Sequence, residues 1–187
     1  MNTHHLTLGT LNDFLSGDEI TDTHDERYRQ KIARLLVLKK NFAKEDITAG
    51  IKLKVSASGK NAILTVDFLV FIHGKAQMVV KYGPGSIITR HRPALAVSRL
   101  VAAHQIPVVV VTNGEQADIL SGSTGRLIGT GFENIPDRAE LARLCGQEET
   151  RLISSRQQEL EARILFAFEV DGSCPCDSDI FRIDGVV

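Results

Sequence analysis

The chain has 187 residues, a length that suits one domain of ordinary size with a sizeable hydrophobic core. Its hydrophobic content of 43% and charged content of 24% are globular values, and a net charge of −1 excludes bulk attraction to any one class of partner. The apolar runs are only as long as strands, and the N-terminus lacks the basic and apolar regions of a secretion signal. We therefore expect a soluble, cytoplasmic protein.

Charge is distributed unevenly along the chain. Residues 1–26 carry six acids and no Lys or Arg, residues 27–145 have a net charge of +10, and residues 146–187 have a net charge of −5. This pattern is compatible with a polyanionic partner for the middle segment. Shielding of that segment by its own acidic flanks explains the pattern equally well.

The first predicted element is an amphipathic helix from about Asp25 to Lys39. Its apolar residues recur at helical spacing, and Thr23 and Glu26 have the spacing of a capping box at its start. Next, apolar residues alternate with Lys52 and Lys54, which predicts a half-exposed strand. Residues 62–72 and 76–82 are nearly continuous apolar runs joined by "HGK", the pattern of two central strands in a tight hairpin.

Helical spacing returns after residue 90, where Pro93 is early enough to occupy the first turn of a helix. The run "IPVVVVT" then predicts a buried strand of the parallel type, reached through that crossover helix. A hairpin in 117–129, a short helix near 136–145 and a longer charged helix near 148–166 complete the expected elements. Cys174 and Cys176 lack the further ligands that a zinc site needs, so we expect free thiols.

Asp67 and Lys81 stand out because each is a charged residue within an apolar strand. Burying either charge unpaired is costly, so the two must be paired with each other or used chemically. If the hairpin pairs as predicted, both side chains reach the same end of the sheet. One interpretation is a self-satisfying ion pair. The other is part of a metal-dependent phosphodiesterase site, in which a carboxylate holds Mg²⁺ and a lysine stabilises developing charge.

Three segments carry a resemblance to a known family: "DERYRQKIARLLVLKKNFAKEDI", "VDFLVFIHGKAQMVVKYGPG" and "VVVVTNGE". Their order resembles the N-terminal nuclease domain of type I restriction enzyme R subunits, within the PD-(D/E)xK restriction-endonuclease-like superfamily. The similarity covers about residues 20–130. It implies a mixed sheet flanked by helices, a Mg²⁺-dependent nuclease site that includes Asp67 and Lys81, and DNA as partner.

The sequence departs from that family at the acid of its Glu-x-Lys motif, which falls on Val79. No Asp or Glu occurs between Asp67 and Glu115, so the best substitute ligand is Glu26 in the first helix. The capping box gives Glu26 a competing structural explanation. Asp67 alone would hold Mg²⁺ weakly, because this ion usually relies on one or two carboxylates plus substrate phosphates.

A basic cluster follows Lys81, in the Gly-rich turn and helix start of "YGPGSIITRHR". Guanidinium groups and helix N-terminal N–H groups suit phosphate, so the cluster is a candidate nucleic-acid site; a solvated basic helix end is the alternative. Its members are Arg90, His91, Arg92 and Arg99.

We predict a restriction-endonuclease-like α/β domain in residues 1–145 and an acidic, partly helical extension in residues 146–187. Three functions remain open. The first is a DNA-binding module with a degenerate metal site. The second is an active, atypical Mg²⁺-dependent endodeoxyribonuclease using Asp67, Lys81 and Glu26. The third is a protein-interaction or regulatory domain without a nucleic-acid role. Expected partners are DNA and either a second copy or a protein that supplies motor or specificity functions.

Overall fold

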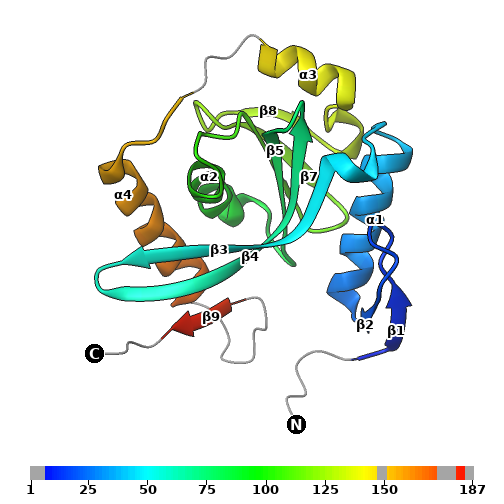
Figure 1. Ribbon diagram of the computed structural model, residues 1–187, viewed down its shortest axis with the longest axis horizontal. Helices are drawn as coiled ribbons and strands as arrows, with labels where there is room; N and C mark the ends of the chain where they lie inside the picture. Colours follow the sequence, from blue (N-terminus) through cyan, green and yellow to red (C-terminus); the bar gives the residue numbers. More distant parts are fainter. Residues whose placement is uncertain (1–6, 147–150, 172–179, 184–187) are drawn as a thin grey trace.

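The computed structural model describes residues 7–146, 151–171 and 180–183. Its centre is a seven-stranded mixed sheet in the order β3-β4-β5-β6-β7-β8, with β9 also paired to β4 (Figure 1). The strands of this sheet are β3 (Ile47–Ala57), β4 (Lys60–Ile72), β5 (Lys75–Tyr82), β6 (Val108–Thr112), β7 (Ala117–Ser121), β8 (Leu127–Thr130) and β9 (Ile180–Ile183). A separate two-stranded sheet is formed by β1 (Gly9–Asn12) and β2 (Glu19–Asp22).

Within the described residues, four α-helices accompany the sheets: α1 (His24–Leu38), α2 (His91–Leu100), α3 (Arg138–Gly146) and α4 (Ser155–Leu165). Short 3₁₀ turns occur at Lys44–Asp46, Ile88–Arg90 and Phe132–Asn134, and a π-helical turn, Phe166–Val170, extends α4. No helix among the described residues is long and apolar enough to cross a membrane.

Strand pairing follows the predicted topology. β3, β4 and β5 pair antiparallel, β5 and β6 pair parallel, and β6, β7 and β8 pair antiparallel. The parallel pair is connected through α2, since parallel neighbours need a crossover of this kind. The turn between β4 and β5 consists of His73 and Gly74, both with positive φ (51° and 75°), which is the requirement of a tight two-residue hairpin turn.

The sheet is covered on both faces, so the predicted α/β fold with helices on either side is confirmed. One core cluster contains buried residues of α2 and α4, such as Val97 and Leu165, packed on Val79 and Val109 of the sheet. The other contains buried residues of α1 and α3 together with alternate residues of the same strands, including Val80 and Val110. Strands buried on both faces explain the nearly continuous apolar runs.

Two parts of the chain differ from the sequence-based expectation. The predicted helix near 148–166 begins only at Ser155, because the hydroxyl of Ser154 accepts a hydrogen bond from the Gln157 N–H and caps the helix there. The pair β1–β2 and the strand β9 were not predicted; each is only four residues long and gives a weak periodic signal. Cys174 and Cys176 lie outside the described residues.

Candidate functional site

Asp67 and Lys81 converge, as predicted, on adjacent strands. Phe68 of β4 pairs with Val80 of β5, and Asp67 and Lys81 are the next residues beyond this pair. The Lys81 Nζ lies 3.4 Å from Asp67 Oδ2 and donates to the Thr65 carbonyl oxygen at 3.0 Å. The two charges therefore meet at the end of the β4–β5 ladder.

The third member of this cluster is Arg29 of α1, which sequence reasoning missed. Its Nε donates to Asp67 Oδ1 at 2.8 Å, while the backbone N–H of Tyr82 donates to Oδ2 at 2.9 Å. The Asp67 side chain is only 3% exposed. Burial opposes its ionisation, but Lys81, Arg29 and the N–H of Tyr82 outweigh burial and lower the pKa of Asp67. Asp67 is thus a buried carboxylate with two cationic partners.

Glu26 is close to this cluster, and the Thr23 half of the predicted capping box is present. Its backbone N–H donates to the Thr23 hydroxyl at 3.1 Å, so Thr23 is the N-cap of α1 as the spacing predicted. The Glu26 carboxylate accepts from Gln30 Nε2 at 2.8 Å and lies 3.8 Å from the Arg29 guanidinium. Arg29 therefore contacts the carboxylates of both Asp67 and Glu26.

Tyr82 fixes the first turn of α1 against the end of β5. Its hydroxyl donates to Asp25 Oδ1 at 2.9 Å, and its ring stacks on Tyr28 at a centroid distance of 5.7 Å. The Arg29 guanidinium carbon lies 5.6 Å from the centroid of the Tyr82 ring. Burial and the hydrogen bond to Asp25 raise the pKa of Tyr82, so the phenol stays protonated at neutral pH. These contacts hold Arg29 in place beside Asp67.

Val79 occupies the position at which a second acid would be needed. It pairs with Leu69 across the β4–β5 ladder and is 0% exposed within the core. Val79 and Lys81 are two residues apart on β5, so they lie on the same face of the strand, as predicted. Among the described residues, no three His, Cys, Asp or Glu side chains are grouped so as to hold a metal ion. Because Arg29 and Lys81 already neutralise Asp67, the residues present do not fit a Mg²⁺ ion.

The predicted basic cluster is divided among separate partners. Arg92 and Arg99 of α2 contact the carboxylate of Glu161 in α4, with N–O distances of 2.7 and 2.6 Å. Gln157 also donates to Glu161, whose side chain is 0% exposed. Burial opposes ionisation of Glu161, but the hydrogen bonds from Arg92, Gln157 and Arg99 lower its pKa. Sequence reasoning did not identify Glu161 as the partner of these arginines.

The other two members of the basic cluster contact the loop that follows β5 and the strand β7. The Arg90 guanidinium donates to the Pro84 carbonyl oxygen at 2.9 Å and packs on Gly83, where a Cβ would lie only 2.5 Å from it. His91 Nε2 lies 2.7 Å from Asp118 Oδ2. The four residues therefore do not form a single anion site.

A different basic surface lies on the β3–β4 hairpin, which projects from the body of the sheet past α4 (Figure 1). Lys52 and Lys54 are exposed on one face of β3. The Lys52 Nζ donates to the Thr65 hydroxyl at 2.7 Å, while Lys81 donates to the carbonyl oxygen of the same residue. Lys52 is thereby linked to the Asp67 cluster through Thr65. The alternation of lysines and apolar residues in β3 was visible in the sequence. We call Lys52, Lys54 and Lys81 the lysine row.

The fold and this cluster define a class of protein: a mixed α/β domain in which a β-hairpin aspartate and a lysine meet beside the first helix. The chain belongs to the family described as the Type I restriction enzyme R protein N terminus, whose model matches residues 24–136. The match includes α1, the β3–β5 strands, α2 and the β6–β8 strands. No curated protein and no solved structure matches the chain significantly.

Proposed function

We propose that this domain binds the phosphate backbone of DNA without cleaving it, on a fold that other chains use for nuclease chemistry. The family suggests a DNA-related or nuclease-related role. The observation that carries the proposal is the state of Asp67: its two oxygens are taken by Arg29, Lys81 and the Tyr82 N–H. In this arrangement the positive charge beside the buried Asp67 carboxylate comes from Arg29 and Lys81 rather than from a metal ion.

The lysine row is the surface that we propose for the phosphates. Lys52 and Lys54 lie exposed on one face of β3 and Lys81 is in β5, and no Asp or Glu occurs in the sequence between Asp46 and Asp67. Lysine ammonium groups on a strand suit non-specific phosphate contacts, which depend on charge rather than on base identity. Arg92 is a further candidate: its side chain is 42% exposed, so it can contact a phosphate while it remains paired with Glu161.

An active, atypical nuclease is the second candidate, and one observation favours it. Glu26 and Asp67 both contact Arg29, so the two carboxylates that such an enzyme would use lie on either side of a single guanidinium. For these acids to become metal ligands, Arg29 would first have to leave. We propose that the wild-type chain binds Mg²⁺ weakly for this reason.

DNA binding is tested by titrating a fluorescent duplex at several salt concentrations. We expect roughly micromolar affinity at low salt and a steep loss of affinity as salt rises, because phosphate contacts release counterions. Replacing Lys52 and Lys54 by Ala should reduce the salt slope by about one to two units. The control variant Arg126→Ala/Arg143→Ala removes two exposed cations elsewhere and should leave the slope unchanged. Equal slopes for both double variants would remove the lysine row from the proposal.

Cleavage is tested with a plasmid-nicking assay in Mg²⁺ or Mn²⁺, together with titration calorimetry of the metal. We expect no nicking and only weak metal binding by the wild-type chain, because one neutralised carboxylate holds the ion poorly. The double variant Arg29→Ala/Val79→Glu removes the competing cation and adds an acid on the face of Lys81, so we expect it to bind the metal. Wild-type nicking that Lys81→Met abolishes would instead establish the second candidate.

A further inference from the structure

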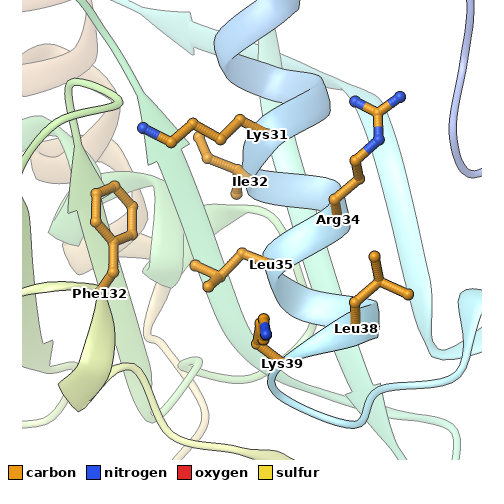
Figure 2. Close-up of a pocket in the computed structure, with 7 residues that line it drawn as sticks. All are labelled: Lys31, Ile32, Arg34, Leu35, Leu38, Lys39 and Phe132. Atoms are coloured by element: carbon orange, nitrogen blue, oxygen red, sulfur yellow. The ribbon is translucent and has the colours of Figure 1, made fainter.

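The outer face of α1 forms a groove with the 3₁₀ turn that contains Phe132 (Figure 2). Its volume is about 320 Å³. The apolar lining consists of Ile32, Leu35, Leu38 and Phe132. Leu38 is 62% exposed at the C-terminal end of the helix, where a polar residue would be expected on a solvent-facing position. The groove thus presents an apolar surface that the described part of the chain leaves uncovered.

Three cations surround this apolar surface: Lys31, Arg34 and Lys39. Lys31 donates to the Gly114 carbonyl oxygen at 2.9 Å, and its Nζ lies 5.7 Å from the centroid of the Phe132 ring. Arg34 lies over the ring of Phe14, at 5.3 Å from its centroid. Carbonyl and aromatic partners position these side chains but do not cancel their charge. Among the described residues no carboxylate lines the groove or pairs with any of the three.

The spacing of the lining residues matches the dimensions of a second helix. They extend from residue 31 to residue 39 of α1, which corresponds to about 12 Å along the helix axis. In Figure 2, Lys31 and Leu35 extend toward the side on which Phe132 lies, while Arg34 and Leu38 lie on the other side of α1. Cations are therefore present at both ends and on both sides of the apolar strip.

We propose that this groove is a docking site for an amphipathic helix of a partner protein, with an aliphatic stripe flanked by acidic residues. Helices of this kind insert apolar side chains spaced by three, four and seven residues into such grooves. The acids of the partner would meet Lys31, Arg34 and Lys39, which supplies orientation and specificity. The proposal does not depend on DNA binding, because none of these residues belongs to the lysine row.

Two other occupants fit less well. The exposed leucine of α4, Leu160, is flanked by Arg156, Arg163 and one exposed acid, Glu159, which pairs with Arg163, so α4 of a second copy would bring net positive charge to a cationic rim. An anionic amphiphile such as a fatty acid has one charged end, whereas the three cations are spread over the whole groove. A helix with acids along both flanks is the occupant that matches this distribution.

The probe is a fluorescein-labelled synthetic helix of about 18 residues, long enough to be partly helical alone, with leucines spaced by three and four residues and flanking glutamates. Its anisotropy is titrated with the full chain. We expect saturable binding that Leu38→Glu weakens at least about tenfold, because an exposed apolar contact is lost and an acid faces the peptide's acids. The control Leu160→Glu also places an acid at an exposed helical leucine and should bind like the wild type.

The remaining outcomes separate the alternatives. A peptide with lysines in place of the glutamates should not bind; equal binding would show that charge does not select the partner and would overturn the proposal. Self-association of the wild-type chain in sedimentation, abolished by Leu38→Glu, would assign the groove to a second copy. Laurate that saturates the groove and displaces the peptide would assign it to an amphiphile. No saturable binding at about millimolar protein would exclude the docking site.

Discussion

Asp67→Ala should lower the free energy of unfolding by about 3–5 kcal/mol, because it removes the carboxylate that pairs with both Arg29 and Lys81 in a largely buried cluster. The two cations, 21% and 14% exposed, would each lose a close carboxylate partner that offsets their desolvation, and Arg29 would keep its longer contact with Glu26. The backbone N–H of Tyr82 would lose its acceptor as well. Urea unfolding followed by circular dichroism measures the loss.

The matched control for this substitution is Glu159→Ala. It breaks the exposed ion pair between Glu159 and Arg163, whose side chains are 54% and 55% exposed, and should cost less than about 1 kcal/mol. If Asp67→Ala were no more destabilising than Glu159→Ala, the Asp67 cluster would contribute little to stability.

The pH dependence of stability gives an independent check on Asp67. Its pKa is lower in the folded state than in the unfolded chain, so its stabilising contribution is fully present above about pH 4, its unfolded range. That contribution is lost as pH falls through the lower folded-state pKa. Wild-type stability should therefore decline below about pH 4, and Asp67→Ala should flatten part of that decline.

Glu161→Ala is the second substitution with a large expected effect. Glu161 is the fully buried acceptor for Arg92, Arg99 and Gln157, so its loss leaves two guanidinium groups without an anion between α2 and α4. Arg92 is 42% exposed and can reach water, which reduces the expected cost to about 2–4 kcal/mol. Urea unfolding of the full chain tests this value.

Glu161→Gln separates the charge of this side chain from its shape. Glutamine keeps an oxygen that Arg99 or Arg92 can use but removes the negative charge, so we expect an intermediate loss of stability. The same variant tests the arginines as phosphate ligands. If Arg92 and Arg99 contact DNA once they are released, its salt slope should be steeper than that of the wild type. An unchanged slope would show that release of the two arginines from Glu161 adds no phosphate contact.

Much of the fold could be predicted from local patterns. The helical spacing before Lys39, the paired apolar runs around "HGK" and the valine run of β6 each specify one type of element and, in order, one topology. The helix α4 was predicted too long because charged residues continue the helical pattern upstream of the cap at Ser154. The packing of α4 against α2 depends on tertiary structure and leaves no local signal in the sequence of α4.

Only part of the candidate site could be predicted, because the sequence shows neighbours along one hairpin but not partners brought together by tertiary packing. Asp67 and Lys81 belong to one hairpin, so strand register alone brings them together. Arg29 is 38 residues away from Asp67, and Glu161 is 62 residues away from Arg99, so these pairs depend on how helices pack on the sheet. The missed residues are the partners that neutralise charges, and only the assembled fold reveals them.

Because α4 packs on the sheet, the region that the family model matches does not include the whole hydrophobic core. The family match ends at residue 136, but Ala162, Leu165, Phe166 and Val170 are part of the core cluster that includes Val55 and Leu64 of the hairpin. A fragment limited to residues 24–136 would expose this apolar surface to solvent. The natural boundary for expression, crystallisation or fusion to another protein therefore lies beyond residue 170.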